Sequence, residues 1–117
     1  MIEELTSRVL QARDVAHRLH WRSNTYALHM ILNTFYDDVL DAVDELVECH
    51  SGEHGLIENF EVQTKPVKDI TAYLSEESEW IQSNRDKISE GSDAIGALVD
   101  VLVNTYQRTI YKLENLT

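Results

Sequence analysis

The chain has little of what stabilises or targets many small proteins. It contains a single cysteine, Cys49, which cannot form an internal disulfide, so we expect a reducing compartment. Proline occurs once and glycine four times, and no apolar run approaches the ~20 residues that span a bilayer. The N-terminus lacks the basic-then-apolar pattern of a secretory signal. These absences predict a cytoplasmic protein without a membrane-spanning segment.

Positive charge is also scarce. Ten Lys and Arg residues stand against 21 Asp and Glu residues, which gives a formal net charge of -11. Binding to the phosphates of nucleic acids needs clustered Lys and Arg, so DNA is not an expected partner, whereas cations are. Hydrophobic residues make up 43% of the 117 residues, which indicates one globular domain over residues 1–117.

Helical periodicity dominates the chain. Apolar residues recur at steps of three and four over residues 2–22, 25–50, 66–90 and 93–115. Ser23 and Asn24 indicate a short turn after the first helix, which predicts an antiparallel hairpin. Pro66 fits the first turn of the third helix, and Ser92 is a good N-cap for the fourth.

Residues 51–65 connect the second and third helices. We expect the second helix to stop near Ser51-Gly52, and a connection this long is unusual within one domain. Leu56, Ile57 and Phe60 are too apolar for a free linker, so the segment should pack on something. The predicted fold class is all-α: an antiparallel four-helix bundle with a long crossover between helices two and three, the connectivity of the ferritin-like class.

Two histidines flank the first turn. His20 precedes it by about three residues and His29 follows it by about five, so a rise of ~1.5 Å per residue places them at one level of the hairpin. Neutral imidazole is the commonest protein ligand for Zn, Cu and Fe, so the pair predicts a metal site. The alternative is that each ring covers the edge of the core.

Two carboxylates share one side of the second helix. Asp44 and Glu48 are spaced i, i+4, and like charges there repel unless a cation lies between them. His29 lies roughly 22 Å from Asp44 along the helix, so one chain cannot place both on one ion. If two copies crossed antiparallel near residue 38, His29 of one would face Asp44 and Glu48 of the other, in a homodimer with two equivalent sites. The alternative is a solvated acidic face.

A family resemblance rests on His20-Trp21, Leu28-His29, Asp44 and Glu48. Together they resemble the signature of the Dps-type mini-ferritins, the starvation-induced relatives of ferritin, over about residues 17–50. The resemblance implies a ferroxidase site built between two subunits, with Trp21 beside it. His20 and His29 would come from one subunit. Asp44 and Glu48 would come from its two-fold mate, within a homodimer or larger homo-oligomer. The implied metal is iron, with another divalent metal such as zinc as the alternative.

The chain departs from this family pattern in three places. Its turn between Trp21 and His29 is shorter, it has no Lys-rich N-terminal arm, and Asn33 stands where the family has an acid. A neutral amide is a poorer ligand for a hard cation, so Asn33 predicts a weak second metal position and weakened Fe(II) oxidation. The alternative function is a non-catalytic ferritin-like helical-bundle dimer that serves as a structural or binding module. A single-chain di-iron oxidase is disfavoured, because the paired Glu-x-x-His motifs are missing.

Cys49, His50 and His54 form a second group of metal-ligand residues. We expect Ser51-Gly52 to break the helix between the two histidines and to spoil their i, i+4 geometry. We therefore interpret the group as a solvated helix end rather than a zinc site.

Overall fold

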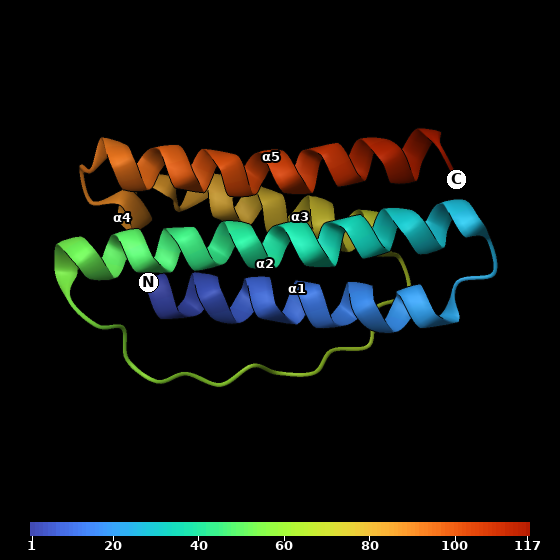
Figure 1. Cartoon of the computed structure of the whole chain (residues 1–117), viewed down its shortest axis with the longest axis horizontal. Helices are drawn as coiled ribbons and strands as arrows, with labels where there is room; N and C mark the ends of the chain where they lie inside the picture. Colours follow the sequence, from blue (N-terminus) through green and yellow to red (C-terminus); the bar gives the residue numbers. More distant parts are fainter.

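The apolar stripes of the sequence form five helices. In the computed structural model, which describes all residues 1–117, these are α1 (Ile2–Arg22), α2 (Tyr26–His54), α3 (Ile70–Ser83), α4 (Arg85–Ser89) and α5 (Asp93–Asn115). The structure contains no strand, so the predicted all-α class is confirmed. The molecule measures 44 × 26 × 20 Å, and the long helices lie along its longest axis (Figure 1). No helix combines the length and the apolar character that crossing a membrane requires.

The four long helices enclose one apolar core. Each packs against two neighbours, in the order α1, α2, α5, α3 and back to α1. Every one of them buries a single stripe of side chains, as the periodicity predicts. Among the largest buried groups are Phe35 of α2 and Tyr106 of α5, whose rings meet edge to face with centroids 5.2 Å apart. The short α4 closes one end against α5.

The α1–α2 hairpin has the predicted form. α1 covers the predicted residues, and only three residues separate it from α2. Ser23 Oγ donates to the carbonyl of His20 at 2.8 Å, and Thr25 Oγ1 accepts from the backbone N–H of Leu28 at 3.2 Å. These bonds satisfy backbone groups that helix ends leave unpaired, and they fix how α2 returns along α1.

Two predicted boundaries are wrong. α2 does not stop at Ser51-Gly52 but continues to His54, and Gly55, with φ +91°, forms its C-cap by donating to the Ser51 carbonyl. A glycine inside a helix costs only about 1 kcal/mol relative to alanine, so Gly52 is tolerated. α3 begins at Ile70 rather than at Pro66, because the Asp69 side chain accepts from Ala72 N–H and caps the helix there.

The third predicted helix is also interrupted. Asn84 separates α3 from α4, and its Nδ2 donates to the Trp80 carbonyl at 2.8 Å. Glu90 and Gly91 then adopt positive φ values of 49° and 81°, which turn the chain into α5. Ser92 caps α5 by accepting from Ile95 N–H, as predicted.

The crossover of residues 55–69 follows α1 along the side away from α2 (Figure 1). Three hydrogen bonds fasten it to α1: Ser7 Oγ to the Glu61 carbonyl, Gln11 Nε2 to the Gln63 carbonyl, and Glu58 N–H to Glu3 Oε2. Ile57 and Val67 pack against the core, whereas Leu56 is 95% exposed. The segment therefore packs on its own chain through only part of its apolar surface.

Candidate functional site

The α1–α2 turn brings His20 and His29 into direct contact. Their rings stack with centroids 3.7 Å apart and planes inclined by 22°. His20 is buried near the C-terminal end of α1, and His29 lies in the first turn of α2. The sequence-based prediction that these two side chains share one level of the hairpin is therefore confirmed.

Each of these histidines is oriented by the backbone of the other. His20 Nδ1 lies 2.8 Å from the His29 carbonyl oxygen, and His29 Nδ1 lies 3.0 Å from the His20 carbonyl oxygen. Because a carbonyl oxygen only accepts, each Nδ1 must carry a proton, which leaves a lone pair on each neutral Nε2. Neither Nε2 has a hydrogen-bond partner within the chain. Metal-ligating histidines are commonly held in this way, with the second ring N–H donated to a carbonyl.

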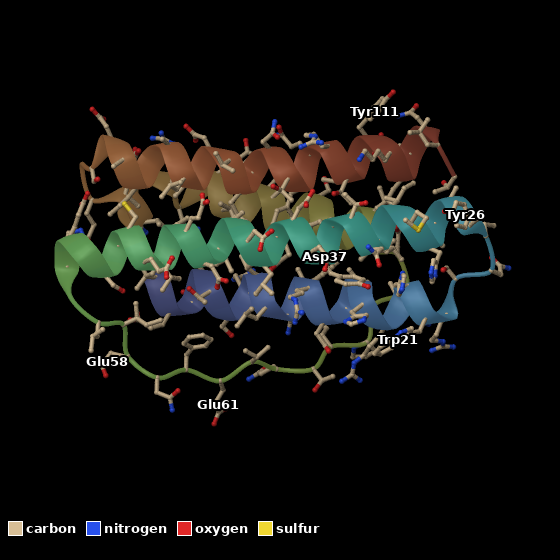
Figure 2. The ribbon with its side chains drawn as sticks, viewed as in Figure 1. Trp21, Tyr26, Asp37, Glu58, Glu61 and Tyr111 are labelled. Atoms are coloured by element: carbon tan, nitrogen blue, oxygen red, sulfur yellow. The ribbon has the colours of Figure 1, made fainter.

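Aromatic side chains surround the pair. His17 stacks on Tyr36 with centroids 4.1 Å apart, and Tyr36 presents an edge to His20 at 5.3 Å. Trp21 lies 4.2 Å from the His17 ring and is 69% exposed, projecting from the end of α1 (Figure 2). Sequence reasoning missed His17, although its i, i+3 spacing from His20 on α1 would have indicated a shared face.

Asn33 lies one helical turn after His29, and its side chain is already engaged. Its Oδ1 accepts from the Tyr36 hydroxyl at 2.7 Å, and its Nδ2 donates to Asp37 Oδ2 at 3.4 Å. The amide oxygen that would have to bind a metal is therefore bound to a phenol instead.

Within one chain, Asp44 and Glu48 do not join the histidine pair. Both are exposed on α2, and neither forms a hydrogen bond or an ion pair. α2 contains no Lys or Arg to neutralise its exposed acids. Besides Glu53 near the C-terminal end, these acids are Asp37, Asp38, Asp41, Asp44, Glu45 and Glu48. The outward face of α2 is therefore strongly negative, and Asp37 marks its middle in Figure 2.

A second histidine group lies at the other end of the molecule. Because α2 continues to His54, His50 and His54 share one helical face, with ring centroids 4.7 Å apart. Glu90 joins them: its Oε2 lies 3.3 Å from His54 Nε2 and 3.9 Å from His50 Nε2. The expectation that a helix break would separate these histidines is thus wrong, and Cys49 does not belong to the group. In the sequence, the i, i+4 spacing of the two histidines indicates that they share a helical face. No feature near Glu90 in the sequence indicates that it joins them.

The chain belongs to DUF5856, a family of unknown function whose model matches residues 20–113. The matched part begins at His20 and contains His29, His50, His54 and Glu90. Neither a search of curated proteins nor a search of solved structures finds a significant match.

Proposed function

We propose that this protein is a ferritin-like four-helix bundle that binds iron at sites shared between two copies of the chain. The observation that carries the proposal is the pairing of His20 with His29. Each ring is held through Nδ1 by the backbone carbonyl of the other residue, so each Nε2 is left without a hydrogen-bond partner in the chain. Imidazole nitrogens suit iron and zinc, and their fixed orientation lowers the entropy lost when a metal binds.

The missing ligands would come from a second copy. Asp44 and Glu48 have no partner within the chain, and they lie on the same outward-facing side of α2. His29 and Asp44 are roughly 22 Å apart along α2, so an antiparallel crossing of two α2 helices near residue 38 would align them. A cation at each site would offset the repulsion between the acidic faces, which otherwise opposes this contact.

The helix arrangement supports a ferritin-like connectivity. α1 and α2 form one antiparallel hairpin, and α3, α4 and α5 form the other half of the core. The crossover of residues 55–69 joins the two halves, as in bundles with one long connection. An Fe(II) ion held by imidazoles and carboxylates is a substrate for oxidation by O2 or peroxide, chemistry that belongs mostly to the metal.

One observation favours the alternative function, a non-catalytic bundle dimer that serves as a structural or binding module. Asn33 Oδ1 already accepts a hydrogen bond from Tyr36, so the position that could support a second metal ion is occupied within the chain. A protein of this kind would keep the assembly without rapid Fe(II) oxidation.

The carboxylates allow a test that leaves the fold intact. In a variant that combines Asp44→Asn with Glu48→Gln, we expect the affinity for anaerobic Fe(II) to fall at least tenfold, because both carboxylate ligands are lost. Stability in urea should stay the same or rise, since neither side chain has a partner in the fold. Glu79→Gln is the matched control, an exposed acid on α3, the helix diagonal to α2. Wild-type Fe(II) affinity in the double variant would contradict the proposal.

Mixed oligomers test whether the site is shared. His29→Gln and Glu48→Gln should each remove tight Fe(II) binding when purified alone. Mixing the two should restore one intact site in each mixed dimer, because that site combines the undamaged His29 of one copy with the undamaged Glu48 of the other. Absence of rescue, or a monomer by light scattering at tens of micromolar, would exclude a site between copies.

A further inference from the structure

We propose that His50, His54 and Glu90 form a second metal site, separate from the site at His20 and His29. It would take a divalent transition metal of borderline softness, with Zn²⁺ as the representative ion. The bound ion would fasten the C-terminal end of α2 to the turn between α4 and α5.

The three side chains already have the spacing of a metal site. Their ligand atoms all lie within 4.8 Å of one another. Around a tetrahedral Zn²⁺ with bonds of about 2.0–2.2 Å, neighbouring ligand atoms lie about 3.4 Å apart. The 3.3 Å between His54 Nε2 and Glu90 Oε2 matches this value, and the 3.9 Å from His50 Nε2 to the same oxygen is close to it. Small side-chain rotations would therefore admit the ion.

His50 can bind through only one of its ring nitrogens. The side chain is 12% exposed, and its Nδ1 is buried without a hydrogen-bond partner. Nε2 is the nitrogen that faces Glu90, so it is the one available to a metal. The packed ring holds this nitrogen in place without a hydrogen bond on the far side.

The backbone at Glu90 also points to a ligand. Glu90 ends α4 with φ 49° and ψ 41°, the left-handed conformation that glycine and asparagine adopt most readily. A glutamate tolerates this conformation poorly, yet here it places a carboxylate beside two imidazoles from another helix. Local helix capping alone would be served equally well by a residue without a carboxylate.

The surroundings leave an open coordination position. The three residues line a cavity of about 280 Å³, to which Met1 and Lys87 also contribute. Glu53 accepts a 2.8 Å hydrogen bond from Ser92 Oγ through Oε1, and its Oε2 lies 3.8 Å from His54 Nε2. A set of two histidines and one glutamate with room for water is typical of zinc sites that keep one exchangeable ligand.

This site is independent of the proposed function. His29 lies in the first turn of α2 and His50 about one turn before its end, roughly 32 Å apart along the helix. α2 runs along the long axis of the molecule (Figure 1). One ion cannot involve both groups, and each can be removed without touching the other.

Zinc titration of chelator-treated protein tests the proposal. By calorimetry, His54→Gln and Glu90→Gln should each weaken one Zn²⁺ site per chain at least tenfold. That site should be unchanged in Glu79→Gln and in the Asp44→Asn/Glu48→Gln variant, which separates it from the site shared between copies. Wild-type Zn²⁺ affinity in both single variants would overturn the proposal. Complete loss of Zn²⁺ binding in the Asp44→Asn/Glu48→Gln variant would overturn it as well.

Hydrogen exchange distinguishes a metal site from histidine–glutamate ion pairs. Zn²⁺ should slow exchange at least tenfold at the Gly55 and Ser92 amides, which close the α2 end and the turn before α5. The protection should disappear in His54→Gln, whose altered side chain is only partly buried and whose loss should leave the fold intact. Equal exchange with and without Zn²⁺ in the wild-type protein would contradict the proposed fastening of α2.

Discussion

Arg8 and Glu77 join α1 to α3 through an ion pair in which Nη1 and Oε2 lie 2.8 Å apart. The Glu77 side chain is only 11% exposed, and the guanidinium of Arg8 also lies 4.2 Å above the Trp80 ring. α1 and α3 share a much smaller contact than α1 and α2, and this pair is one of the direct polar links between them, beside the hydrogen bond from Tyr73 to Gln11.

Arg8→Ala should therefore destabilise the protein by about 1–3 kcal/mol, because Glu77 would keep a mostly buried charge without its cation. The loss is smaller than for a fully buried pair, since the Arg8 side chain remains 34% exposed. Arg18→Ala is the control on the same helix. Arg18 pairs with Asp14, both side chains are exposed, and we expect a change below about 0.5 kcal/mol. Urea unfolding measures both, and equal losses would contradict this account.

Removal of the hydroxyl group should change the stability of the fold in opposite directions at the two buried tyrosines, Tyr73 and Tyr106. Tyr106 OH is buried without a partner, whereas Tyr73 OH donates to Gln11 Oε1 at 3.1 Å. Burial raises the pKa of the Tyr106 phenol well above its ordinary value, so the group stays neutral. We expect Tyr106→Phe to stabilise the fold by about 0.5–1 kcal/mol and Tyr73→Phe to destabilise it by about 1 kcal/mol. Destabilisation by Tyr106→Phe in urea would indicate a water bound at that hydroxyl.

The attachment of the crossover to α1 should depend on pH. The backbone N–H of Glu58 donates to Glu3 Oε2 at 3.0 Å, and this bond lowers the pKa of the Glu3 carboxyl below its ordinary 4.5. Because the folded-state pKa is lowered, the contribution to stability is present above pH 4.5 and is lost as the pH falls through the lowered pKa. The amide proton resonance of Glu58 should shift on acidification with a midpoint below 4.5. Glu3→Gln should abolish this titration; its persistence would assign the shift to another group.

Local signals in the sequence were sufficient for most of the fold. The stripes of α1 and α5 and the cap at Ser92 depend on neighbouring residues only, and the structure has them where they were predicted. The end of α2 was ambiguous because Gly52 and Gly55 are both suitable stop signals. Contacts from distant parts of the chain, such as the Ser92 hydroxyl on Glu53, favour the longer helix.

The predicted start of α3 was wrong for a related reason. Pro66 and Asp69 are both good helix-start residues, and sequence alone could not rank a proline in the first turn against an aspartate N-cap.

The two candidate sites differ in how far the sequence predicts them. The contact between His20 and His29 follows from a short turn and two helical registers, whereas Glu90 reaches His50 and His54 from 36 residues beyond His54 and depends on how α4 packs.

Asn33→Asp tests the position at which the proposed mini-ferritin resemblance would require an acid. Without metal, the new carboxylate would face Asp37 at i, i+4 in place of the present 3.4 Å hydrogen bond, so stability should fall by about 0.2–0.5 kcal/mol. The same variant should bind Fe(II) more tightly at the proposed site. At an effective dielectric near 20, a unit charge ~4 Å away changes the electrostatic interaction energy with the cation by a few kcal/mol.

We therefore expect Asn33→Asp to tighten the binding of a second Fe(II) and to speed its oxidation, with little change at the first position. Titration of Fe(II) into both proteins, followed by absorbance, measures stoichiometry and rate together. Asn33→Ser is the control, since it loses the hydrogen bonds to Tyr36 and Asp37 without adding charge. If all three proteins have the same stoichiometry and rate, the side chain at position 33 does not face the metal, and the non-catalytic dimer becomes the better account of the chain.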